Sequence, residues 1–237
     1  MRFVSSLLLL QLTAAVLPVA GAEPMTPAEF GEKVRASGGQ VNFVFGAERP
    51  FPQCHASTVV EAAPGVLVAA WFAGTKEKSP DVGIWHSRFE DGKWAKPTLL
   101  IKMNEDAHWN PVLFRDAEDT LYLFFKVDPE IPTWRTFWMQ STDAGKTWSE
   151  PAELVAGDVG GRGPVRSKPI TMSDGAWLAG ASTELGDWLP FADISRDRGK
   201  TWERSENFKF DKAQLPGKGA IQPTVWESAP GKVHALL

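Results

Sequence analysis

The sequence has 237 residues, of which 25 are basic and 29 acidic, for a net charge of −4. This slight acidic excess, with no basic stripe, excludes nucleic acid as an expected partner. Cys54 is the only cysteine, which excludes an internal disulfide, so the fold must be stabilised by packing. The 11 tryptophans, 21 glycines and 18 prolines indicate short strands, frequent turns and layers filled with tryptophan.

Residues 1–22 have the features of a secretory signal peptide. Arg2 is followed by an apolar stretch over residues 7–17, and the segment ends in the small residues of positions 20–22. We therefore expect a secreted or periplasmic protein; the alternative is a membrane anchor that stays uncleaved. No later segment approaches about 18 uncharged apolar residues, so no membrane span is expected after signal cleavage.

Residues 23–50 are expected to lead into the main domain, with one short helix and a first strand. The helix is predicted in the segment TPAEFGEKVRASG, which begins at Thr26. Threonine and proline are typical of a helix start, and glycine is typical of a helix end. The main domain is then predicted over residues 51–237.

The main domain contains short apolar blocks bounded by Gly, Pro, Asp or Asn, as expected for strands. No convincing helical period interrupts them. The blocks fall into three groups of four, and a fourth group begins at Ala220. They cover residues 55–62, 65–74, 82–88 and 94–101, then 110–116, 120–127, 136–142 and 148–154, then 167–173, 176–183, 190–196 and 202–208.

A short motif recurs within these groups, at residues 87–94, 141–148 and 195–202. Its tryptophans, Trp94, Trp148 and Trp202, fall at a constant interval of 54 residues. In the second copy, STDAGKTW, Asp143 can accept hydrogen bonds from the turn, and Gly145 supplies a backbone conformation that other residues avoid. The motif therefore predicts a structural turn between two strands. The first copy has a shifted glycine and lacks the threonine, so its turn is expected to be weaker.

A repeat of this length with four strands per unit predicts an all-β fold, a β-propeller of four-stranded blades. The sequence contains about three and a half such blades, because the fourth breaks off within its second strand. We therefore expect a domain that is incomplete at its C-terminus. The alternative is a compact four-bladed propeller with a poor last blade.

The S-x-D-x-G-x-T-W copies resemble the Asp-box, or BNR, repeats of the sialidase (neuraminidase) superfamily. The ordered series from CHASTVVEA through WNPVLF, LYLFFKV and SKPI to IQPT is similar to bacterial exo-sialidase-like proteins over about residues 50–225. The resemblance implies a propeller that is six-bladed in the full family. It also implies an exo-glycoside hydrolase that acts on terminal acidic or related sugars of extracellular glycans.

The resemblance further implies a cluster of arginines for the sugar carboxylate, an acid and a tyrosine nucleophile. Asp81 occupies the place of the family's catalytic Asp and is the candidate acid/base. Where the family has an arginine in the first strand, this sequence has Gln53-Cys54-His55-Ala56, which departs from the pattern. Tyr122, the only tyrosine, alternates with leucines and is expected to pack in a strand.

Polar residues that break the apolar strands are the other site candidates, because the innermost strands of a propeller bring such positions together around its axis. Glu184 is predicted as a second catalytic carboxyl. Trp109 and Trp134 are candidate stacking walls. The predicted substrate-binding set is His55, Lys76, Asn110, Lys126, Trp134, Arg135, Arg166, Lys168 and Gln222.

Three function classes follow from these observations. The first is the sialidase-like glycosidase, and the second is a propeller that binds carbohydrate without cleaving it. The third, a protein-interaction scaffold, requires large exposed apolar patches that the strand pattern does not demand. No cofactor is expected, and no His/Asp/Glu spacing indicates a metal site. Because no tyrosine nucleophile can be assigned, the 237-residue chain alone is predicted not to turn over a fluorogenic sialoside.

Overall fold

A computed structural model describes residues 26–211, 213 and 217–237, so the predicted signal peptide lies outside the described residues. The chain divides into two compact units, Met1–Asn42 and Phe43–Leu237. Along the described residues, no helix is both long enough and apolar enough to cross a membrane.

The first unit contains the helix α1 (Pro27–Ala36), at the position that the sequence predicts. Thr26 precedes the helix, and its hydroxyl oxygen accepts a hydrogen bond from the Glu29 backbone amide at 3.3 Å. The Glu29 carboxylate in turn accepts from the Thr26 backbone amide at 2.8 Å. This reciprocal pair satisfies two amide groups that the first turn of a helix leaves free.

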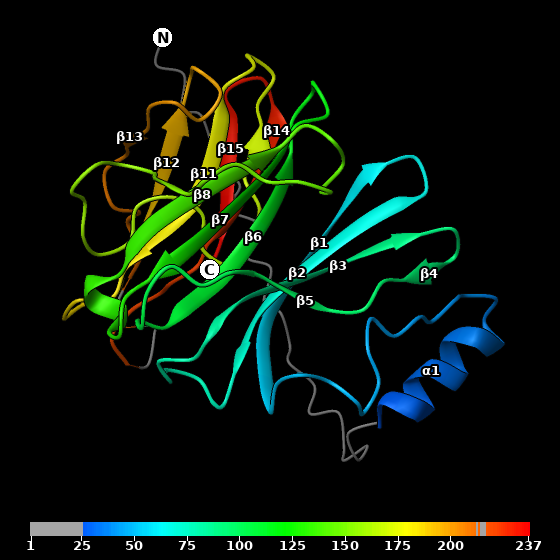
Figure 1. Ribbon diagram of the computed structural model, residues 1–237. Helices are drawn as coiled ribbons and strands as arrows, with labels where there is room; N and C mark the ends of the chain where they lie inside the picture. The colour runs from blue at the N-terminus through cyan, green and yellow to red at the C-terminus, as the bar shows by residue number, and fades with distance from the viewer. Residues whose placement is uncertain (1–25, 212, 214–216) are drawn as a thin grey trace, which may run out of the picture. The chain divides into compact units, whose positions relative to one another are not determined.

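The second unit is built from antiparallel sheets that follow one another along the chain (Figure 1). We call them blades 1 to 4. Blade 1 contains β1 (Gln53–Ala63), β2 (Val66–Gly74), β3 (Gly83–Glu90), β4 (Lys93–Trp94) and β5 (Thr98–Ile101). Blade 2 contains β6 (His108–Arg115), β7 (Leu121–Val127), β8 (Arg135–Ser141) and β9 (Ala152–Glu153), with the short helix η1 (Ile131–Thr133) before β8. Blade 3 contains β10 (Ile170–Thr171), β11 (Trp177–Thr183), β12 (Leu189–Ser195) and β13 (Glu203–Arg204), and blade 4 contains β14 (Thr224–Ala229) and β15 (Lys232–Leu236).

Each predicted block overlaps a strand of these blades, and the last strand of blades 2 and 3 is only two residues long. The block 94–101 contains the end of β4 and all of β5, so blade 1 has five strands and not the predicted four. One difference lies before the domain, where no strand forms between Ser37 and Pro52. Val44 and Phe45 pack instead as irregular chain against Phe51 and Trp71. These apolar residues therefore pack a connecting segment onto blade 1 and do not form the predicted strand.

The hydrophobic core lies between neighbouring blades. Leu123 and Phe125 of β7 belong to a cluster with Phe72 of β2 in blade 1. Tyr122 and Phe124, which alternate with them, belong to a second cluster with residues of blade 3. Since successive side chains of a strand point to opposite faces, both faces of blade 2 are buried.

The recurrent turn has the predicted structural role in blade 2. The Asp143 carboxylate accepts a hydrogen bond from the Thr147 hydroxyl at 2.6 Å and from the Lys146 amide at 3.0 Å. The Ser141 hydroxyl accepts from the Gly145 amide at 2.9 Å, and Gly145 has φ +78°. Asp197 and Thr201 repeat the carboxylate–hydroxyl contact in blade 3.

The first copy of the motif is a different turn. Glu90 pairs with Lys93, which leaves Asp91 and Gly92 as a two-residue hairpin loop with φ of +52° and +79°. Asp-Gly with two positive φ angles is the chemistry of a type I′ hairpin. The Asp91 side chain has no hydrogen bond to the described part of the chain, in agreement with the expected weaker turn.

The first strands of the blades meet one another. The Thr58 hydroxyl of β1 accepts a hydrogen bond from the Leu113 amide of β6 at 3.2 Å. The Lys168 ammonium group, just before β10, donates to that hydroxyl at 3.1 Å and to the Leu113 carbonyl at 2.6 Å. Lys168 therefore connects blades 1, 2 and 3 along their first strands.

Candidate functional site

A rare backbone conformation recurs where the chain enters each blade. Ala56, Asn110, Arg166 and Gln222, which follow one another at intervals of 54 to 56 residues, have φ of +51°, +43°, +63° and +57°. L-amino acids other than glycine avoid positive φ, and residues held there by their surroundings concentrate at functional sites. In β1 and β6 the residue coincides with an irregularity in strand pairing. The same local geometry thus turns one side chain per blade away from the regular ladder.

Arg166 is held in a tight turn. The Ser167 amide donates a hydrogen bond to the Val165 carbonyl at 2.7 Å, which closes a three-residue γ-turn around Arg166. A γ-turn with positive φ at its centre is rare and strained. The Ser167 hydroxyl also lies 2.9 Å from the Thr224 hydroxyl of blade 4. The backbone of Arg166 is therefore fixed by contacts on both sides.

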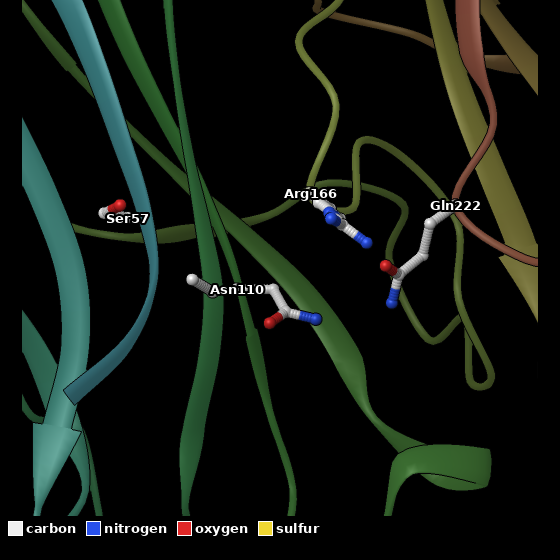
Figure 2. A pocket seen from close by; sticks show the side chains of 5 residues that line it. Ser57, Asn110, Arg166 and Gln222 are labelled. Atoms are coloured by element: carbon white, nitrogen blue, oxygen red, sulfur yellow. The ribbon is translucent and has the colours of Figure 1, made fainter. Parts of the chain in front are cut away.

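The four positive-φ residues and Ser57 line one pocket of about 440 Å³. Figure 2 shows the polar ends of Asn110, Arg166 and Gln222 directed into the same space from three blades, with Ser57 beside β1. The volume lies within the range of small-molecule sites. We call this space the strand-entry pocket.

The polar groups of the strand-entry pocket are available to a ligand. Among the described residues, no hydrogen-bond partner or ion-pair partner occupies the Arg166 guanidinium or the Asn110 and Gln222 carboxamides. Ala56 contributes only a methyl group at its equivalent position. Arg166 is thus the one cation among the lining residues, placed between two uncharged amide groups.

Three residues of the predicted binding set, Asn110, Arg166 and Gln222, therefore lie together. His55 is next to Ala56 in the chain, but it does not line the strand-entry pocket; its ring stacks on Phe72 with centroids 5.5 Å apart. Sequence reasoning did not select Ser57 or Ala56. Their small side chains give no signal in the sequence, and the repeated spacing with Asn110 points only to Ala56.

Other members of the predicted set have structural contacts elsewhere. Lys126 is completely buried, and its ammonium group donates to the Thr136 hydroxyl and to the Arg162 carbonyl, each at 2.6 Å. Arg135 forms an exposed ion pair with Glu153 at 2.9 Å. Lys76 is exposed in the loop after β2 and does not line the strand-entry pocket.

The two tryptophans expected as stacking walls lie in the core. Trp109 is 1% exposed, and its indole nitrogen donates to the Asp128 carbonyl at 2.8 Å. Trp134 is 2% exposed and meets Trp109 edge to face with ring centroids 6.2 Å apart. A ligand in the strand-entry pocket has access to neither ring face without movement of the core.

The two candidate catalytic carboxyls differ in environment. Asp81 is exposed, and its Oδ2 accepts from the Thr75 amide at 2.8 Å and hydroxyl at 2.9 Å. Glu184 is half-buried just after β11; burial raises its pKa, while the charge of Lys126 acts in the opposite direction. The Glu184 Oε1 atom is buried without a hydrogen-bond partner. A desolvated carboxyl of this kind can hold a proton for general-acid chemistry.

Glu184 lies two residues after a contact of β11 with the strand-entry pocket. The Ser182 hydroxyl, two residues earlier, accepts a hydrogen bond from the backbone amide of Gln222 at 3.3 Å. Asp81 and Glu184 are not among the residues that line the strand-entry pocket, and their catalytic roles stay predictions.

Comparison with known proteins gives a consistent family and fold. A family model described as a BNR repeat-like domain matches residues 65–237. No curated protein matches the sequence. Among solved structures, a Hadza microbial sialidase superposes with a TM-score of 0.59 at 19% identity over 75% of this chain and 40% of its own.

Two further sialidases have the same architecture. The Trypanosoma rangeli sialidase in complex with sialic acid has a TM-score of 0.58 at 19% identity, covering 76% of this chain and 33% of its own. A variant of the NanB sialidase from Streptococcus pneumoniae has a TM-score of 0.62 at 11% identity, covering 80% and 49%. The chain thus spans less than half the length of these three proteins. At such identities the likeness shows the fold, and it confirms the predicted β-propeller architecture.

Proposed function

Because this chain belongs to the BNR repeat-like domain family of sialidase-like proteins, we propose that the strand-entry pocket binds a terminal acidic sugar for an exo-glycoside hydrolase. The observation that carries this proposal is the convergence of Arg166 with Asn110 and Gln222 on one open space. Because residues 1–22 are predicted to be a signal peptide, we expect the substrate to be a glycan outside the cell.

The chemistry of the lining residues supports a ligand with a single carboxylate. A guanidinium group binds a carboxylate through two parallel hydrogen bonds. The carboxamides of Asn110 and Gln222 each offer donors and an acceptor, as sugar hydroxyl and N-acetyl groups require. With Ala56 at the fourth position, the pocket holds one cation where the family pattern has several. Binding of the sugar carboxylate therefore depends on Arg166.

Glu184 and Asp81 are the proposed acid/base groups. Hydrolysis of a glycoside needs a protonated carboxyl beside the leaving oxygen, and the raised pKa of Glu184 suits that task. The Oδ2 atom of Asp81 is already bound twice by Thr75, which leaves Oδ1 to act on a ligand. Glu184→Gln and Asp81→Ala would each remove one group, and unchanged turnover in an active form of the protein would remove that residue from the mechanism.

A second function, carbohydrate binding without cleavage, is favoured by one observation. The position equivalent to Asn110, Arg166 and Gln222 in blade 1 is Ala56, so the first strand provides no charged group to the pocket. Turnover of a fluorogenic sialoside, abolished by Glu184→Gln, would favour the hydrolase. Because this chain alone is predicted not to turn over a sialoside, the binding protein would be favoured by saturable sugar binding without turnover in a form of the protein that has the complete propeller.

The proposed ligand class is tested by calorimetry with N-acetylneuraminic acid and its methyl ester. We expect Arg166→Met to weaken binding of the free acid by about tenfold or more, because a charge-assisted pair is lost. Binding of the ester, which has no carboxylate charge, should change much less. Arg196→Met is the matched control, since Arg196 forms a surface ion pair with Asp174 at 3.3 Å. Equal affinity of wild type and Arg166→Met for the free acid would contradict the proposal.

A further inference from the structure

The loop that carries Arg166 is fixed by a buried charged network between blades 2 and 3. We define the Arg166 loop as residues 157–167. We propose that Lys126 is a positioning residue, whose buried ammonium group holds this loop so that Arg166 faces the strand-entry pocket. The role rests on the proposed function, because that function assigns Arg166 to the ligand.

The contacts of Lys126 end on the backbone of this loop. Its Nζ donates to the Arg162 carbonyl at 2.6 Å and to the Thr136 hydroxyl at 2.6 Å. The Thr136 hydroxyl itself donates to the Arg162 carbonyl at 2.6 Å. Lys126 has no exposed surface and lies over the Trp134 ring at 5.7 Å from its centroid. The ammonium group is thus closed to a ligand, and one backbone carbonyl accepts from both side chains.

Blade 3 holds the same stretch of loop from the other side. The Asp193 carboxylate of β12 is buried and accepts from the Arg162 side chain at 2.7 Å and from the Gly163 amide at 2.5 Å. The Arg162 guanidinium also donates to the Trp202 carbonyl at 2.8 Å. Arg162 is therefore bound through its backbone to blade 2 and through its side chain to blade 3.

Two glycines of the loop lie in close contact with the neighbouring blades. Gly161 has φ +124°, and a Cβ atom there would collide with the Ser182 carbonyl. Gly163 has φ +75°, and a Cβ atom there would collide with the Leu154 side chain. Gly161 is thus required by close approach to backbone as well as by conformation, whereas at Gly163 the positive φ is the main constraint, because the colliding atom is the end of a side chain. A shift of Arg162 would therefore meet close contacts on both sides, and we expect it to affect the residues that follow.

The path from Arg162 to Arg166 is short and rigid. Gly163 is anchored by Asp193, and Val165 is 1% exposed in the core shared by blades 1 and 2. The γ-turn at Arg166 begins at the Val165 carbonyl. Loss of the Lys126 contact should therefore move the point from which the Arg166 side chain extends.

An apolar side chain could fill the site of Lys126 with less desolvation, because buried charges stabilise a fold little unless they are fully paired. The network includes like and unlike charges, namely Arg162, Asp193 and the nearby Glu184 and Asp158. What the lysine adds over an apolar residue is a directed bond to one backbone carbonyl. That property determines the geometry of the loop.

The test compares Lys126→Met, the milder Thr136→Val and the exposed-lysine control Lys96→Met. Hydrogen exchange of the backbone amides in the Arg166 loop gives a readout without ligand. Calorimetry with N-acetylneuraminic acid and its methyl ester gives the second readout, in the single variants and in the double variant Lys126→Met/Arg166→Met.

We expect faster exchange in the Arg166 loop of Lys126→Met and Thr136→Val, with β2 and the control unchanged. Binding of the free acid should weaken by about fivefold or more, with loss of the preference over the ester and little further effect in the double variant. A purely structural role would weaken both ligands alike. If wild type binds neither ligand, the proposed function fails, while the exchange data still decide the role of Lys126. Unchanged exchange in both variants, or additive losses in the double variant, would overturn the positioning role.

Discussion

At the scale of single residues, the strand-entry pocket is built on backbone strain. Asn110 has φ +43°, a conformation that glycine adopts without the penalty of a Cβ atom. Asn110→Gly is expected to raise the free energy of unfolding relative to Asn110→Ala by about 1 kcal/mol. Urea unfolding of the two variants measures this difference, and both should lose sugar affinity. An Ala variant as stable as the Gly variant would contradict the strain at this position.

Lys126 predicts a pH dependence of stability. Burial lowers the pKa of Lys126 to about 7; Asp193, Asp158 and Glu184 oppose this shift, and Arg162 adds to it. Between pH 7 and the ordinary lysine pKa of 10.5, the unfolded chain holds a proton that the folded chain has released. The free energy of unfolding therefore rises with pH in this window.

The measurement is the difference in unfolding free energy between wild type and Lys126→Met at pH 7 and near pH 10. Groups common to both proteins cancel, so the difference reports Lys126. It should shift in favour of wild type as the pH rises. A difference that is constant, or that shifts in favour of the variant, would contradict a lowered pKa.

The sequence located some site residues and not others for a physical reason. Three polar residues stand at strand starts, before the apolar pattern of the strand begins, and they are therefore visible in the sequence: Asn110, Arg166 and Gln222. Lys126 interrupts a strand in the same way, yet it follows Tyr122 and Phe124 on the face of β7 that packs towards blade 3. Because both faces of a blade are buried, a polar residue in such a strand cannot be assigned to solvent or to a ligand by pattern alone.

At the scale of elements, the recurrent turns stabilise their hairpins unequally. Hydrogen bonds from the Thr147 side chain and backbone and from Ser141 hold the pKa of Asp143 well below its usual range. Asp143→Asn should lower the melting temperature by several degrees at neutral pH, whereas Asp91→Asn should change it little, because asparagine also tolerates the positive φ of the type I′ turn. The stabilisation by Asp143 is present above the ordinary carboxyl pKa of 3.8 and is lost as the pH falls towards its folded pKa. Calorimetric melting at several pH values checks this, and equal effects of the two substitutions would refute it.

Strand positions were predictable because each block is short, apolar and bounded by turn residues. The length of the outermost strands was not, since β9 and β13 contain only two residues each. After Trp148, the Ser149 amide donates to the Gln140 carbonyl at 2.9 Å, so the chain continues beside β8 without a regular ladder. Such irregular pairing produces no apolar alternation in the sequence, so the length of these strands could not be predicted.

At the scale of the whole second unit, stability depends on close approach between blades. A Cβ atom at Gly180 of β11 would collide with the Pro223 carbonyl, which lies just before β14 in blade 4. Gly180→Ala is therefore expected to destabilise the protein by about 1–3 kcal/mol through overpacking. Gly46 is the matched control, because its Cβ position is open. Denaturant unfolding measures both, and a neutral Gly180→Ala variant would show that blades 3 and 4 do not pack as described.

Arg166, Asn110 and Gln222 are proposed to form one ligand site. The most direct measurement is an NMR titration of the purified chain with N-acetylneuraminic acid, observed at the side-chain amides of Asn110 and Gln222. We predict saturable shifts of both signals in wild type, strongly weakened with the methyl ester and in Arg166→Met. Signals that do not move, or that move equally in Arg166→Met, would contradict the account.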